Sequence, residues 1–112
     1  MRSKVSTDRA DELKAWLTQN AREILGPSEN IEKVVYLNNT IKNDPNASNL
    51  GISFDHRYEI QPKAIFTTSD ETGNIELGII EISTSAIGLK DVGILHTYAK
   101  MVEPKYAFLL CE

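Results

Sequence analysis

One glutamate stands inside an apolar run near the carboxyl end of the chain. Glu81 lies within IELGIIEIS, residues 75–83, and isoleucines flank it on both sides. An unpaired buried carboxylate either costs several kcal/mol or has its pKa raised until it is neutral. We therefore expect Glu81 to be hydrated, paired with a cation or bound to a metal ion.

Most familiar catalytic motifs are missing from the sequence. It has no Cys/His cluster with metal-ligand spacing, no glycine-rich phosphate-binding motif and no nucleophile elbow. His96 falls on the apolar stripe of an expected helix, which favours a core histidine over a general base. Cys111 ends an apolar run, which favours a buried small hydrophobe over a nucleophile.

The composition predicts one domain. A chain of 112 residues, 41% of them hydrophobic, is long enough for one core and too short for two. Its net charge of −4 gives no overall attraction to phosphate, so nucleic-acid binding needs a local basic patch or a partner. One cysteine, no signal-like segment and no membrane-spanning apolar run predict a cytoplasmic protein.

Residues 8–25 have the apolar spacing of an amphipathic helix. Thr7 or Asp8 is the candidate N-cap, and Gly26 with the following proline is the stop. Trp16 lies on the apolar stripe, so we expect it to be a core anchor.

A second helix is expected over residues 90–102, with Asp91 as its cap and Glu103-Pro104 as its end. Tyr98 and Lys100 lie off the apolar stripe of this helix. The stripe consists of Val92, Leu95, His96, Ala99 and Val102.

Alternating or continuous apolar runs predict strands at residues 31–37, 52–68, 75–83 and 106–111. Pro62 interrupts the second of these and marks a bulge or an edge position. The turn formers of SDETGN, residues 69–74, predict a hairpin. The Asn-rich segment at about 38–51 is expected to be an exposed loop.

The expected order is therefore α-β-β-β-α-β, an α/β domain with a mixed sheet flanked by helices. The last strand, helix and strand form a parallel right-handed crossover because their connections are short.

This order and two short matches resemble the core of the PD-(D/E)XK, or restriction-endonuclease-like, nuclease superfamily over about residues 8–111. Pro62-Lys63 opens one strand and Glu81-Ile82-Ser83 closes the next. In that family the Asp after the Pro and the carboxylate of the second motif hold Mg²⁺, and a Lys two residues later activates the attacking water. Here Glu81 matches, whereas Lys63 replaces the Asp and Ser83 replaces the Lys.

The resemblance implies a nuclease-like domain with an incomplete metal site. Its catalytic positions are Glu81, Lys63 and Ser83, and Glu81 alone is a candidate metal ligand. A cation there meets a like charge in place of its second ligand, so we expect Lys63 to pair with Glu81 and no cofactor to bind. Glu59 and Glu76 are the carboxylates that could replace the missing ligands by migration, although both favour solvent-facing positions.

The implied function is a binding or assembly module beside nucleic acid, either DNA or RNA, with contacts from Tyr98, Lys100 and Lys90. An active Mg²⁺-dependent endo- or exonuclease with migrated ligands is one alternative. An α/β protein-interaction module without a nucleic-acid role is another, in which Glu81 and Lys63 form an ordinary ion pair across strands.

Many members of the superfamily carry a further helix after the last strand, and this sequence stops one residue after that strand. The run at 106–111 needs cover on both faces. We therefore expect either a truncated chain or a homodimer that buries the open face.

Overall fold

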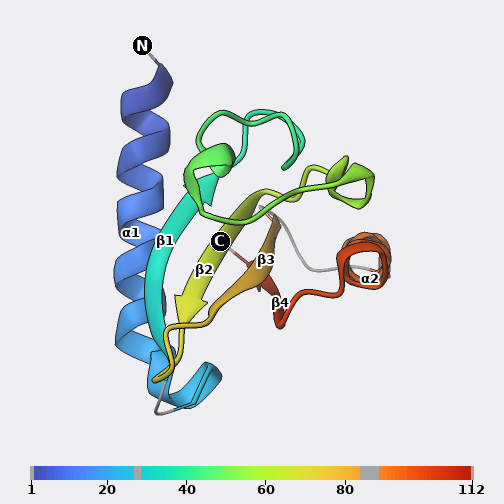
Figure 1. Ribbon diagram of the computed structural model, residues 1–112. Coiled ribbons are helices and arrows are strands. Elements are labelled where there is room, and N and C mark those ends of the chain that lie inside the picture. Colours follow the sequence, from blue (N-terminus) through green and yellow to red (C-terminus); the bar gives the residue numbers. More distant parts are fainter. Residues whose placement is uncertain (1, 27–28, 84–88, 112) are drawn as a thin grey trace.

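A four-stranded mixed sheet forms the centre of the protein, with one helix on each face (Figure 1). The computed structural model describes residues 2–26, 29–83 and 89–111. The helices are α1 Arg2–Ile24 and α2 Leu89–Val102. The strands are β1 Asn30–Tyr36, β2 Ala64–Ser69, β3 Ile75–Ser83 and β4 Tyr106–Cys111.

The strand order in the sheet is β1-β2-β3-β4. β1, β2 and β3 pair antiparallel, and β3 pairs parallel with β4. The predicted order of elements and the parallel pairing of the last two strands are therefore confirmed. No helix in the described part of the chain is long and apolar enough to cross a membrane.

Each face of the sheet has its own apolar core. α1 lies along β1, and its Leu13 and Leu17 pack with Phe66 and Ile80 of the sheet. On the other face α2 lies over β3 and β4, while the segment between β1 and β2 covers the rest. Ile65 and Ile79 are fully buried beneath them.

The strand predicted at 52–68 is wrong over its first two thirds, because β2 begins at Ala64. The preceding residues contain a short 3₁₀ helix, His56–Tyr58, and no strand. Their alternating apolar side chains, such as Phe54 and Tyr58, pack on the α2-side core instead of forming a sheet. Pro62 is buried just before β2, a central strand, so it marks neither a bulge nor an edge.

The Asn-rich segment is less exposed than its composition predicts. Most of its polar residues face solvent, but an apolar or acidic side chain is buried at every third position. These buried residues are Ile41, Asp44, Ala47 and Leu50. The segment therefore forms part of the α2-side core, to which Ile41, Ala47 and Leu50 belong.

α1 begins at Arg2, ahead of the predicted cap at Thr7 or Asp8. The spacing of apolar residues indicates only the part of a helix that has an apolar stripe. The first turns of α1 are mostly polar in sequence, so the prediction did not include them. Gly26, with a φ of 108°, ends the helix as predicted. Trp16 is 43% exposed, so its assignment as a core anchor is wrong. Leu13 and Leu17 occupy the centre of the buried stripe, and the indole lies on its flank.

The buried face of α2 is rotated from the predicted stripe. Leu95 and Tyr98 pack on the core and Val102 is buried, whereas His96 is exposed. The prediction of a core histidine is therefore wrong, and so is the placement of Tyr98 off the stripe. The large tyrosine ring covers more of the sheet than an imidazole, which sets the rotation. α2 starts at Leu89, so Asp91 lies in the first turn instead of at the cap.

Candidate functional site

The start of β2 and the end of β3 meet at one end of the sheet. Antiparallel pairing places Ala64 opposite Ile80, so the preceding Lys63 lies beside Glu81. The backbone N–H of Lys63 donates to Oε2 of Glu81 at 3.2 Å. Because side chains alternate along a strand, Glu81 shares the α2 face with Ile79. The two short matches noticed in the sequence are thus neighbours in space.

The contact between Lys63 and Glu81 differs from the predicted ion pair. The ammonium of Lys63 forms no ion pair within 4.0 Å of Glu81, since the ion pairs of the described residues join other side chains. The backbone amide satisfies the carboxylate instead. This change has a simple geometric reason: Lys63 is exposed and its long side chain reaches into solvent.

The carboxyl group of Glu81 lies in an unfavourable environment for its charge. Partial burial raises its pKa above the usual value, and the negative charge of Asp91 raises it further. The hydrogen bond from Lys63 and the positive charge of Lys63 oppose this rise without cancelling it. Raised carboxyl pKa values of this kind cluster at functional sites, although structural networks produce them as well.

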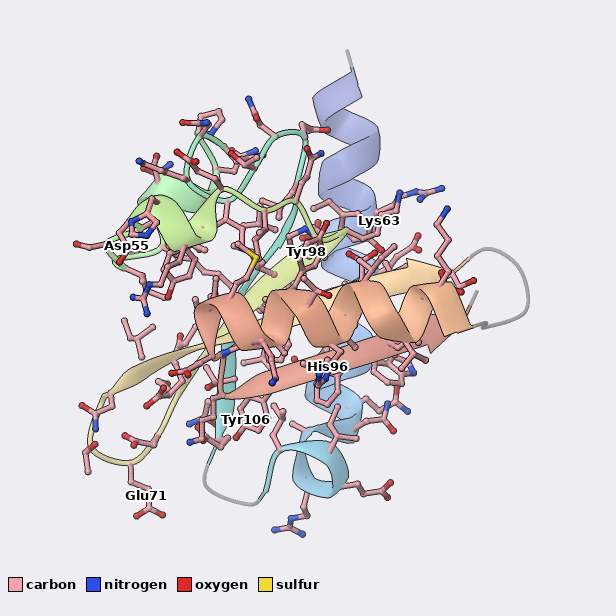
Figure 2. The ribbon with its side chains drawn as sticks, turned by 90° about the vertical axis from the view of Figure 1, so that its right-hand side faces the viewer. Asp55, Lys63, Glu71, His96, Tyr98 and Tyr106 are labelled. Carbon is pink, nitrogen blue, oxygen red and sulfur yellow. The ribbon has the colours of Figure 1, made fainter. Side chains whose placement is uncertain are left out.

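Tyr98 joins this site from α2. Burial and the negative charge of Glu81 raise the pKa of its phenol, while a hydrogen bond with the backbone of Gln61 lowers it. Figure 2 shows Tyr98 on the side of α2 nearer to Lys63, with His96 on the other side. The sequence analysis missed Asp91 as a neighbour of Glu81 and the Gln61 backbone as a partner of Tyr98. The sequence did contain a signal for Asp91: the connection between β3 and α2 is short, so the start of α2 stays near the end of β3.

Other residues expected at a site are placed as follows. Ser83 is buried two residues beyond Glu81 on the same face of β3. Glu59 is exposed and pairs with Lys42 at 3.6 Å. Glu76 lies opposite Thr68, five residues before Glu81 and therefore about 16 Å away along the strand. Glu76 is thus too far to share an ion with Glu81.

The candidate nucleic-acid contacts divide between surface and core. Lys90 and Lys100 are exposed at the two ends of α2, whereas Tyr98 is half-buried. No group of three or more His, Cys, Asp or Glu side chains that could hold a metal ion occurs in residues 2–26, 29–83 and 89–111. The side chain of Cys111 lies outside the described residues.

Comparison with protein-family models, with curated proteins and with solved structures found no match to this chain. The site is therefore interpreted from its own geometry.

We expect Glu81→Gln to raise stability at neutral pH. A carboxyl whose folded pKa is raised favours folding below its unfolded pKa, and this contribution is lost as pH rises through the folded pKa. The amide keeps an acceptor for the Lys63 N–H and removes the buried charge. Urea unfolding at pH 7 should show the gain, and it should vanish below about pH 4. A variant less stable than the parent at pH 7 would assign Glu81 a structural role.

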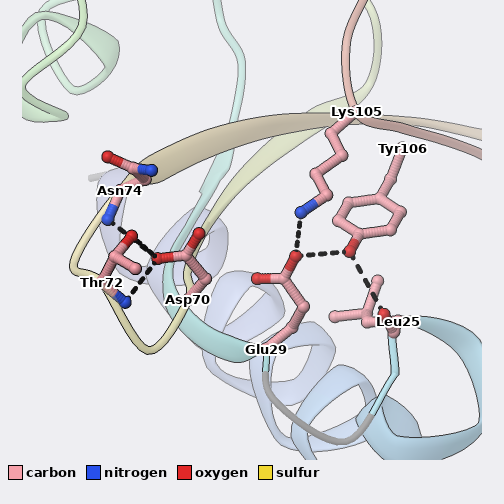
Figure 3. Close-up of polar contacts among 7 residues, drawn as sticks. All are labelled: Leu25, Glu29, Asp70, Thr72, Asn74, Lys105 and Tyr106. Atoms are coloured by element: carbon pink, nitrogen blue, oxygen red, sulfur yellow. Dashed lines mark hydrogen bonds and ion pairs between the residues drawn. The ribbon is translucent and has the colours of Figure 1, made fainter.

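A second polar cluster ties the start of β4 to the end of α1 (Figure 3). Glu29 is 9% exposed, and its Oε1 accepts hydrogen bonds from Lys105 Nζ and, at 2.9 Å, from the Tyr106 hydroxyl. That hydroxyl also lies 3.2 Å from the Leu25 carbonyl oxygen. The hydrogen bond from Lys105 holds the pKa of Glu29 below its usual value. These contacts join residues 105–106 to residues 25–29 across the chain, so we assign this cluster to stability.

The two glutamates should respond oppositely to pH. The folded pKa of Glu29 is depressed, so its contribution is present above its unfolded pKa and is lost as pH falls through the folded value. We expect Glu29→Gln to be less stable than the parent at pH 7 and to lose less stability on acidification to pH 3. The exposed Glu71→Gln is the control in the same urea titrations. Identical pH profiles for Glu29→Gln and the parent would contradict this assignment.

Proposed function

We propose that the chain is a nuclease-like domain, of the restriction-endonuclease-like kind, whose metal site is incomplete and which acts as a binding or assembly module beside nucleic acid. The observation that carries the proposal is the hydrogen bond from Lys63 N to Glu81 Oε2. It joins the start of β2 to the end of β3. In the PD-(D/E)XK superfamily, which the chain resembles, these two places carry the two halves of the metal-binding motif. The α-β-β-β-α-β order with β3 parallel to β4 also supports it.

The chemistry of the pair favours binding over catalysis. In the superfamily that the chain resembles, an Asp and a second carboxylate hold Mg²⁺. Here the cationic Lys63 follows Pro62, and Glu81 is the single matching carboxylate. A cation placed against Glu81 meets the positive field of Lys63. The serine at position 83 has no ammonium with which to orient an attacking water. A Mg²⁺-dependent nuclease with migrated ligands stays the alternative, with Asp91 as the charged neighbour that could serve it.

The nucleic-acid surface in this proposal is the exposed side of α2. Lys90 and Lys100 lie there in solvent, Lys90 at the start of the helix and Lys100 near its end. With a net charge of −4, binding is expected to be weak and confined to this patch, or to occur through a partner. A cytoplasmic location belongs to the same proposal.

The proposal is tested by salt titration of fluorescent single-stranded, double-stranded and branched oligonucleotides. Affinity should fall linearly on a log–log plot with rising salt, and Lys90→Glu and Lys100→Glu should each weaken it several-fold. Lys14→Glu, an exposed charge reversal on α1, is the matched control and should weaken binding less. Absence of binding to every substrate at about 50 mM salt would favour the protein-interaction module instead.

A further inference from the structure

A hollow of about 410 Å³ lies between α1 and the sheet. The helix contributes Arg9, Glu12 and Trp16 to its lining, and the strands contribute Tyr36, Ile82 and Leu110. This volume is within the range of about 300–1,000 Å³ that holds small ligands, so a large aromatic side chain fits. The hollow lies on the opposite face of the sheet from Glu81.

The apolar side chains around this hollow are only partly covered. α1 lies along β1, so on its face β3 and β4, the strands farther from β1, keep half-buried Ile82, Phe108 and Leu110. On the other face α2 covers the same two strands. Trp16 borders the hollow and is 43% exposed. A half-exposed aromatic side chain beside partly covered aliphatic side chains, with charged residues around them, is typical of a protein interface.

The flank of α1 that carries Trp16 has a symmetric pattern of charge. Arg9 lies seven residues before Trp16 and Glu23 lies seven residues after it, so all three fall on one side of the helix. Each charge is about 10.5 Å from Trp16 along the helix axis. Both are exposed, and neither forms an ion pair with a described residue.

We propose that this surface binds a second copy of the chain, with the two α1 helices packed antiparallel about a two-fold axis near Trp16. Because Arg9 and Glu23 are equidistant from that axis, each arginine then lies opposite the glutamate of the other copy. The two indoles meet over the hollows, and each helix covers Ile82 and Leu110 of the other copy. A two-fold interface requires such a self-complementary surface.

The charge pattern selects this occupant over nucleic acid. Glu12 and Glu23 stand on the same flank as Arg9, so a phosphate backbone laid along it meets no net positive charge. A second copy meets opposite charges at both ends of the contact. This surface is separate from the α2 patch, so the dimer and the proposed nucleic-acid binding stand or fall independently.

The test is a charge swap followed by sedimentation equilibrium of the full chain. The parent should dimerise, and Arg9→Glu or Glu23→Arg alone should raise the dimer dissociation constant about tenfold, because each variant places two like-charge contacts in the interface. Combining Arg9→Glu with Glu23→Arg should restore the parent value to within about threefold. Arg22→Glu, an exposed reversal on another side of α1, is the control and should leave dimerisation unchanged.

Trp16 is the sole tryptophan and gives a second readout. Its emission should shift to the blue as the protein concentration rises. The midpoint of this shift should agree with the dissociation constant measured by sedimentation. Circular dichroism of each variant shows whether its fold is kept. A parent that is monomeric at high concentration, or a double variant no better than the single ones, overturns the proposal. Quenching of Trp16 by an oligonucleotide bound to a monomer overturns it as well.

Discussion

Gly78→Ala is expected to lower the free energy of unfolding by about 3 kcal/mol. Gly78 lies on β3 between Phe66 of β2 and Tyr106 of β4. The Phe66 ring lies across the glycine, so an alanine Cβ would overlap its Cζ and Cε1 atoms. The ring has no room to withdraw, because Phe66 is fully buried and stacks on Phe108 with centroids 5.8 Å apart.

The control for this prediction is Gly93→Ala in α2. A Cβ at Gly93 meets no atom within 4 Å, so the change should stabilise the helix by about 0.5–1 kcal/mol. Adding Phe66→Leu to Gly78→Ala should recover part of the loss, which a double-mutant cycle measures in urea. If Gly78→Ala unfolds within about 0.5 kcal/mol of the parent, the ring does not need the glycine.

Asp44→Ala is expected to destabilise the fold by about 3 kcal/mol. Asp44 is 1% exposed, and its carboxylate accepts hydrogen bonds from the backbone N–H groups of Asn38 at 2.8 Å, Asn46 at 2.9 Å and Ala47 at 3.4 Å. These bonds close the segment that buries Ile41 against the sheet. Alanine leaves three amides without their acceptor.

Two variants calibrate the Asp44 prediction. Asp44→Asn keeps one acceptor oxygen and should lose less. Asp70→Ala removes a carboxylate that accepts three similar bonds from Thr72 and Asn74, but in an exposed hairpin turn where water replaces it (Figure 3). Urea unfolding followed by Trp16 fluorescence should rank Asp44→Ala as the least stable. An equal loss for Asp70→Ala would show that burial of Asp44 adds nothing.

The spacing of apolar residues predicted the helices and strands that have one whole face packed in the core. The helices, the strands after residue 63 and the parallel pairing of β3 with β4 follow from it. It failed where tertiary packing replaced regular structure, as in residues 52–63, whose alternating apolar side chains pack without strand pairing. The burial of Asp44 was likewise not predictable, because the segment around it is polar in composition.

The candidate site was predictable in position but not in its contacts. The β2–β3 hairpin brings Lys63 to Glu81, as the order of the elements indicated. Which group of Lys63 makes the contact depends on the direction of an exposed side chain, and no sequence pattern fixes that direction. The faces of His96, Tyr98 and Trp16 depend on helix rotations of less than one residue's turn, which the competition among apolar side chains decides.

The most direct measurement at Glu81 is a metal-dependent cleavage assay. Branched, single-stranded and double-stranded substrates are incubated with Mg²⁺ or Mn²⁺ and the unmodified chain, Glu81→Ala, or a double variant with Lys63→Asp and Ser83→Lys. We expect no cleavage by the unmodified chain, and a gain of metal affinity only in the double variant, which rebuilds the full motif. Mg²⁺-dependent cleavage by the unmodified chain that Glu81→Ala abolishes would contradict the incomplete site and establish an active nuclease.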